Sequence, residues 1–250
     1  MNQFYLDNRR FIDLTKPLDI SIPMRGDSKN LRAWYVDSPR FEPVRTDKYV
    51  GSVAEGGSVN FRNIYFNPHG HGTHTECLGH ITKEVYSVND IINRYFFKAQ
   101  VISVLPKRRD NMGKVDFVIT RDQLEKLKLE AEALIIRTLP NDQLKKSKNY
   151  SATNPPYFEA DCADLIIEKG VKHLLVDVPS VDREEDNGEL AFHHRFWEVP
   201  NKPNFERTIT ELVFVHNEIK DGEYVLNLQI SPFVNDAAPS RPILYQIENL

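Results

Sequence analysis

The chain has 250 residues, of which 40% are hydrophobic and 27% charged, proportions ordinary for a soluble globular protein with a substantial core. Its formal net charge is −4, from 32 basic and 36 acidic residues, and the absence of a basic stripe argues against a nucleic-acid partner. No apolar run approaches the roughly 18 to 20 residues that cross a bilayer, so we expect no membrane span.

Two features of the sequence indicate a cytoplasmic protein. The two cysteines, Cys77 and Cys162, do not make a disulfide framework, which is typical of a reducing compartment. Residues 1–10 lack the apolar core and the small-residue cleavage site of a signal peptide.

The first half of the chain alternates between irregular segments and short apolar runs. Residues 11–14 are predicted to form a first strand, and residues 63–66 a strand that leads into a histidine-rich segment. A short helix is predicted at residues 88–93, with Asp90 as its cap. The β-branched apolar run at residues 99–105 predicts a buried strand.

Helices and strands alternate through the following part of the chain. Thr120 is predicted to begin a helix, because Gln123 completes a capping box with it. Residues 133–138 and 171–178 are predicted to be buried strands, and the helix between them, at residues 158–169, ends at a glycine. This order is typical of strands that are covered by helices.

The last part of the chain holds two more predicted strands, at residues 211–215 and 224–230. Because Asp221 and Gly222 lie between them, the pair is predicted to form an antiparallel hairpin. No repeat, low-complexity segment or linker interrupts the sequence. The expected fold class is therefore α/β, with a single mixed-sheet domain over residues 1–250.

Residues 67–80 carry the strongest chemical signal. Four of the eight histidines lie in these fourteen residues, together with one glutamate and three glycines. Histidine offers a neutral nitrogen ligand near pH 7, glutamate offers an anionic oxygen, and glycine lets the backbone approach a ligand closely. The pattern predicts a metal-binding loop, and the alternative is a polar surface turn. The candidate ligands are His69, His71, His74, Glu76 and His80.

A second polar group follows the predicted strand at residues 171–178. It comprises Asp177, Ser180 and Asp182, and then the pair His193-His194. Functional groups often follow buried strands in α/β proteins, although a capped turn with Asp182 bonded to local amides is the simpler interpretation. The histidine pair favours function, because it could complete a metal site begun in the first segment.

Nucleophilic catalysis is a rival interpretation. Cys77 lies near His74 and His80 in sequence, so a thiolate activated by histidine is chemically sensible. Cys77 could instead face the packed side of the loop or bind the metal. Ser180 lacks the Gly-x-Ser-x-Gly elbow of serine hydrolases, which makes a serine nucleophile a weaker hypothesis.

The order of these features resembles the cyclase-like metal hydrolases, a family that includes bacterial kynurenine formamidase and isatin hydrolase. The family signature is His-x-Gly-Thr-His-x-Asp-x-Pro-x-His, and residues 70–80 read Gly-His-Gly-Thr-His-Thr-Glu-Cys-Leu-Gly-His. Four further segments resemble family motifs in the same order, and they are residues 11–18, 176–182 with His193-His194, 209–212 and 236–241. The resemblance implies the swivelling β/β/α fold of that family.

The resemblance also implies a ligand set for one or two divalent ions, commonly zinc or manganese. Carried over by position, the ligands are His74, Glu76, His80, His193 and Glu211. The first histidine of the signature is replaced by Gly70, and either His69 or His71 could take its place.

Metal-assisted hydrolysis of an amide is the activity that the resemblance implies. His80 or Glu211 would relay the proton, and the enzyme would be a homodimer or homotetramer that acts on a small molecule. Aromatic residues at Trp34, Tyr65, Tyr157 and Trp197 suggest an apolar or aromatic substrate, although aromatic side chains more often pack cores. The alternative from another class is a non-catalytic metal- or ligand-binding protein on the same scaffold.

Overall fold

Four parallel strands form the centre of the fold in a computed structural model, which describes residues 2–111, 113–125 and 130–250. In spatial order they are β9 (Phe96–Val104), β12 (Ala133–Thr138), β14 (His173–Val176) and β15 (Thr208–Glu211). Every residue of β12 and β14 is buried, as expected of parallel strands with both faces covered. The buried strands predicted at residues 99–105, 133–138 and 171–178 are confirmed by β9, β12 and β14. The strand predicted at residues 211–215 is wrong, because β15 ends at Glu211.

Antiparallel strands extend this centre on both sides into an eleven-stranded mixed sheet. Beyond β9 lie β16 (Gly222–Asn227), β18 (Ile243–Asn249), β2 (Arg10–Asp13) and β1 (Gln3–Tyr5), and β3 (Leu18–Asp19) also pairs with β18. Beyond β15 lie β8 (His74–Glu76) and β17 (Ala237–Pro239). The predicted mixed α/β class is confirmed.

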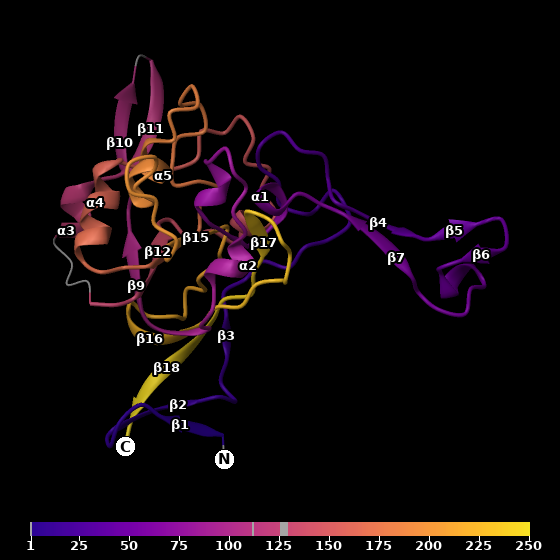
Figure 1. The fold of residues 1–250 in the computed structure, drawn as a ribbon, viewed down its shortest axis with the longest axis horizontal. Coiled ribbons are helices and arrows are strands. Elements are labelled where there is room, and N and C mark those ends of the chain that lie inside the picture. Colours follow the sequence, from indigo (N-terminus) through magenta and orange to yellow (C-terminus); the bar gives the residue numbers. More distant parts are fainter. Residues whose placement is uncertain (1, 112, 126–129) are drawn as a thin grey trace.

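Short helices cover the sheet. They are α1 (Pro68–His71), α2 (Val88–Ile91), α3 (Arg121–Glu125), α4 (Asp161–Glu168) and α5 (Ala191–Phe196), with 3-10 turns at η1 (Val53–Glu55), η2 (Leu78–His80) and η3 (Gln143–Lys146). In Figure 1, α3 and α4 lie on one side of the central strands, and α1 and α2 on the other. Within the described ranges, no helix has both the length and the apolar character needed to cross a membrane.

Smaller sheets project from the body. One contains β10 (Lys107–Asn111), β11 (Lys114–Ile119) and β13 (Tyr157–Phe158), and the others pair β4 (Arg40–Pro43) with β7 (Arg62–Tyr65) and β5 (Arg45–Thr46) with β6 (Tyr49–Val50). The ribbon of β4 and β7 reaches far from the body in Figure 1, and every residue of β7 is exposed. The strand predicted before the histidine segment therefore exists, but it lies in a projecting ribbon.

The predicted hairpin in the last part of the chain is wrong. β15 and β16 are not neighbours, because β14, β12 and β9 lie between them in the sheet. β15 ends at Glu211, and the next residue, Leu212, has a left-handed backbone with φ of 56° that turns the chain out of the sheet. Asp221 therefore precedes, and Gly222 begins, a strand that pairs with β9 and β18 instead.

Helix boundaries follow local capping chemistry, with two corrections. Gln123 accepts a hydrogen bond from the Thr120 backbone N–H at 3.1 Å, as the predicted capping box requires. The cap of α2 is Ser87, whose hydroxyl accepts from the Asn89 N–H, and Asp90 lies inside the helix. The helix predicted from residue 158 begins three residues later, because Phe158 belongs to β13.

The core around β12 yields a test of stability. Ile135 is fully buried at the centre of the sheet, so Ile135→Ala leaves a cavity and is expected to lower the free energy of unfolding by about 2–5 kcal/mol. Leu144→Ala is the matched control, because that side chain is 68% exposed and its loss should cost less than about 0.5 kcal/mol. Equal losses in urea unfolding would contradict this description of the core.

Candidate metal centre

Local structure turns the histidine segment inward. The Asn67 side chain caps α1 by accepting from the Gly70 N–H at 3.1 Å, and this short helix carries His69. In β8, His74 and Glu76 are two residues apart and therefore share one face of the sheet. β8 pairs with β15 so that His74 lies opposite Glu211, which brings two distant segments to one point.

The Glu76 carboxylate lies at the centre of the cluster and is only 1% exposed. Its Oε1 atom is 3.1 Å from Nε2 of His193, and its Oε2 atom is 3.1 Å from Nδ1 of His69. Nε2 of His80 is 3.8 Å from the same Oε2 atom. Three histidine rings from three different elements therefore converge on one buried carboxylate.

Glu211 and His74 form the deepest part of the cluster. The His74 ring donates from Nδ1 to the Gly72 carbonyl at 3.0 Å, and its Nε2 atom is 3.5 Å from Oε2 of Glu211. The other Glu211 oxygen accepts from the Val181 N–H at 3.2 Å. Both side chains are almost completely buried.

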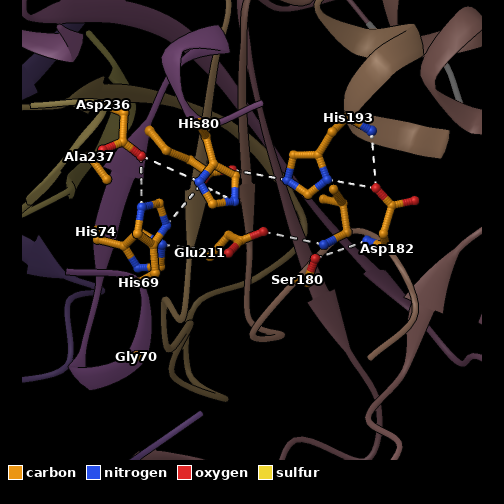
Figure 2. Close-up of polar contacts among 12 residues, drawn as sticks. His69, Gly70, His74, His80, Ser180, Asp182, His193, Glu211, Asp236 and Ala237 are labelled. Atoms are coloured by element: carbon orange, nitrogen blue, oxygen red, sulfur yellow. Dashed lines mark hydrogen bonds and ion pairs between the residues drawn. The ribbon is translucent and has the colours of Figure 1, made fainter. Parts of the chain in front are cut away.

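Two aspartates flank the histidine rings. Asp182 accepts from Nδ1 of His193 at 2.6 Å, and Asp236 accepts from Nε2 of His69 at 2.9 Å and from Nδ1 of His80 at 3.3 Å. Figure 2 shows Asp236 and Asp182 at opposite ends of the row that His80 and His193 form. Asp236 was missed as a site residue, although it opens the closing motif at residues 236–241.

The structure brings His69 into the cluster and leaves His71 outside it. Nδ1 of His71 accepts from the Asn67 N–H at 2.8 Å, and Nε2 donates to the Asp37 carbonyl at 2.6 Å. Both ring nitrogens are therefore occupied by backbone groups, so the prediction of His71 as a ligand is corrected. His194 also lies apart, because its ring contacts the Val199 carbonyl.

Position 70 is glycine for a packing reason. A Cβ atom placed there would lie 2.7 Å from Cγ2 of Val36 and 3.2 Å from the Ala33 carbonyl oxygen. The segment around Val36 therefore fills the space that a larger side chain at position 70 would need. His69, from the preceding position, points its ring into the cluster instead.

The carboxylates change the proton affinity of the rings. Burial alone would lower the pKa of His69, but Asp236 and Glu76 outweigh it and raise the pKa to about 10. Burial likewise opposes a charge on His193, and Asp182 with Glu76 raises its pKa to about 10. Burial raises the pKa of Glu211, whereas the neighbouring histidines hold the pKa of Glu76 well below its usual range. The carboxylates of the cluster therefore strongly favour a positive charge among the histidine rings.

Two buried atoms test whether a cation fits the cluster. Nε2 of His74 and Oε2 of Glu76 are buried without any hydrogen-bond partner, a costly arrangement in a protein interior. Oε2 is 3.1 Å from a histidine nitrogen, yet the geometry makes no hydrogen bond. Ligand atoms of His69, His74 and Glu76 lie within 4.8 Å of one another, as do those of Glu76, His80 and His193. A divalent ion suits this set of imidazole and carboxylate donors.

The rival nucleophiles are placed for structure. Cys77 is fully buried, its thiol donates to the Tyr86 carbonyl at 3.3 Å, and burial raises its pKa to about 12. The Ser180 hydroxyl accepts from the Asp182 N–H. Trp197 packs its ring 5.2 Å from that of His193 and is fully buried, so it supports the cluster rather than facing a substrate.

The chain matches known sequences over most of its length. The profile of the family described as Putative cyclase matches residues 12–183. Kynurenine formamidase from Bacillus anthracis is 30% identical over 93% of this chain and 99% of the relative. Kynurenine formamidase from Bacillus thuringiensis (strain Al Hakam) is 29% identical over 92% and 97%.

A solved structure shares the fold. Isatin hydrolase A from Ralstonia solanacearum has a TM-score of 0.67 and covers 92% of this chain and 91% of its own, at 13% sequence identity. The arrangement of the mixed sheet is therefore common to both proteins.

The buried thiols give a first test of the centre. Because burial raises the pKa of both Cys77 and Cys162 to about 12, we expect neither thiol of the native protein to react with a thiol reagent between pH 7 and 9. Both should react after unfolding in denaturant. Rapid modification of Cys77 in the folded protein would revive the thiolate hypothesis.

The raised pKa values of the histidines predict a pH-dependent stability of the metal-free protein. Protonated His69 and His193 stabilise the fold fully below pH 6.5, and this stabilisation is lost as the pH rises towards 10. We expect the free energy of unfolding to fall by more than about 1 kcal/mol over this range. Denaturant unfolding after chelation measures it, and the metal-loaded protein is the control, because its ligating nitrogens are already unprotonated.

Proposed function

Because the chain belongs to the putative cyclase family, we propose that it hydrolyses the amide bond of an aryl formamide or a cyclic amide. It is a metal-dependent amide hydrolase, a function shared with relatives of which it covers almost the whole length. The finer choice of substrate draws on the relatives, which are named kynurenine formamidase and isatin hydrolase.

The observation that carries the proposal is that Oε2 of the buried Glu76 carboxylate has no hydrogen-bond partner. A buried carboxylate with an oxygen that has no hydrogen-bond partner, and with three histidine nitrogens within 3.8 Å, is an arrangement that a cation completes. We propose that Glu76 holds a zinc or manganese ion together with histidines and a second carboxylate. The proposed ligands are His69, His74, Glu76, His80, His193 and Glu211.

The bound ion would supply Lewis acidity, which lowers the pKa of a coordinated water and polarises the substrate carbonyl. The protein's own residues then determine geometry and proton movement. His74, His193 and Glu211 are at most 3% exposed and form the closed side of the centre. The His80 side chain is 32% exposed and that of His69 is 18% exposed, so the centre opens towards these residues.

His80 is the residue we propose for proton relay. Its ring lies at the open side of the centre, where one nitrogen donates to Asp236 and the other faces the buried carboxylate. While Nε2 is not bound to the ion, this partly exposed ring can take up a proton on that nitrogen and deliver it to the departing amine nitrogen. Glu211 is fully enclosed and bonded to the Val181 N–H, which suits a ligand better than a relay.

We also propose that the protein is cytoplasmic and that it forms a homodimer or homotetramer. One feature supports each part of this proposal. Both cysteines are free thiols, as expected in a reducing compartment. The β4–β7 ribbon exposes Ile64 and Tyr65, and Phe61 is exposed directly before β7. A two-stranded ribbon of this kind is only marginally stable without a partner surface.

Metal dependence is the direct test of the function. Dialysis against a chelator is expected to abolish hydrolysis of aryl formamides and cyclic amides, and zinc or manganese should restore it. Glu76→Gln should reduce both the bound metal and kcat/KM by at least about 100-fold, because it removes the central carboxylate. Metal content is measured by elemental analysis, and turnover by absorbance.

The control for this test keeps the fold and leaves the centre intact. Glu223→Gln changes an exposed glutamate of β16, which pairs with Lys98 at 3.4 Å on the surface. It should retain wild-type metal content and turnover. Undiminished activity after verified loss of metal would overturn the proposal.

A further inference from the structure

We infer that Asp236 and Asp182 are positioning residues that fix which nitrogen of each histidine ring faces Glu76. The inference rests on the proposed function, because it concerns how the metal-binding nitrogens are held. Each aspartate accepts the N–H of a ring from outside the cluster. In the neutral ring that binds a metal ion, the opposite nitrogen then carries no proton and points at the central carboxylate.

The pair of Asp182 and His193 shows the arrangement on one side. Asp182 accepts from the backbone N–H groups of Phe192 and His193 at 2.8 and 3.1 Å and from the His193 ring at 2.6 Å. These bonds to the first turn of α5 leave the carboxylate little freedom. The proton of a neutral His193 ring is therefore held on Nδ1. Nε2 faces Oε1 of Glu76 at 3.1 Å, a contact that is a hydrogen bond when the ring carries both protons.

Asp236 repeats the arrangement on the other side and serves two rings at once. Its Oδ2 atom accepts from Nε2 of His69 and from Nδ1 of His80, whose rings are stacked with centroids 4.2 Å apart. The backbone carbonyl of Asp236 accepts from the Cys77 N–H at 3.1 Å, and the next residue, Ala237, pairs with Glu76 in the sheet. The carboxylate is thus anchored beside β8.

The same logic holds for His74 without a carboxylate. Its Nδ1 atom donates to the Gly72 carbonyl, which can only accept, so Nε2 carries no proton in the neutral ring. When all four rings are neutral, their unprotonated nitrogens therefore face carboxylate oxygens. This arrangement is repulsive unless the rings are protonated or a cation lies between them, which explains why the outer partners matter for metal affinity.

Position 69 acquires a distinct mode of binding from this geometry. His74, His80 and His193 present Nε2 to the carboxylates, whereas His69 presents Nδ1, because its Nε2 is bonded to Asp236. Because Asp236 bonds Nε2 of His69, the nitrogen left to face Glu76 is Nδ1, the one nearer the His69 backbone.

A direct ligand role for Asp236 is the competing interpretation. Nε2 of His69, Nδ1 of His80 and a carboxylate oxygen of Asp236 lie within 4.8 Å of one another and would suit an ion of their own. In that case, Nδ1 of His69 would carry the proton and donate to Oε2 of Glu76. Oε2 has no hydrogen-bond partner despite the distance of 3.1 Å, so the geometry favours the positioning role.

Zinc titration separates the two roles. We expect Asp236→Ala to weaken zinc affinity by about 10- to 100-fold without reducing the stoichiometry at saturation. Asp236→Asn should have a smaller effect, because its amide oxygen can still accept from both rings. Asp110→Asn, at an exposed carboxylate of β10, is the control and should bind as wild type does. Chelator competition gives the affinities.

Each other outcome of the titration has a definite meaning. A reduced stoichiometry in Asp236→Ala would show a direct ligand and overturn the inference, and so would unchanged affinity. Absence of zinc binding by the wild-type protein would overturn the proposed function itself, so the two failures are distinguishable.

A second measurement needs no variant and does not depend on activity. Long-range proton–nitrogen spectra of the zinc-loaded wild-type protein should show the ring proton of His69 on Nε2 and those of His80 and His193 on Nδ1. A His69 ring protonated on Nδ1 would overturn the inference even if Asp236→Ala failed to fold.

Discussion

The burial of the Glu76 carboxylate is the constraint on which the rest of the site depends. An ionised group that is 1% exposed must be surrounded by compensating charge or donors, or folding would drive it to the neutral form. Here the compensation comes from rings on α1, η2 and α5, which are far apart in the chain. The aspartates behind the rings extend the network outward. The buried charge therefore links the histidine loop, the second polar segment and the closing motif into one unit.

The change from parallel to antiparallel pairing in the sheet makes this convergence possible. β14 and β15 run parallel, and β8 pairs antiparallel with β15. His74 and Glu76 of β8 therefore meet Glu211 at the end of β15 and His193 from the segment after β14. Thr73, directly before β8, connects this region by hydrogen bonds: its hydroxyl accepts from the Ile22 N–H and donates to the Leu212 carbonyl. Leu212 adopts a strained left-handed conformation directly after Glu211. Backbone strain is thus held at the residue where the strand must end.

Local patterns in the sequence determined the parts of the structure that depend on neighbouring residues. The apolar run of β12, the capping box at Thr120 and the density of ligands in residues 67–80 could all be recognised in short windows. The hairpin prediction failed because the partners of β16 are chosen by the whole sheet and not by the turn before it. Asp236 was missed because a lone aspartate shows no function until the sheet places it beside β8. His69 and His71 were equivalent in sequence, and only the structure separates them, because His69 faces two carboxylates and His71 is held by backbone groups.

The contact between Gly70 and Val36 has a consequence for how sequences of this family can change. A histidine at position 70, where the family signature has one, cannot be introduced alone, because its first side-chain carbon would meet Cγ2 of Val36 at 2.7 Å. The segment that contains Val36 would first have to withdraw or lose volume. Positions 36 and 70 lie far apart in the chain, yet the size of the side chain at one of them limits the size that fits at the other.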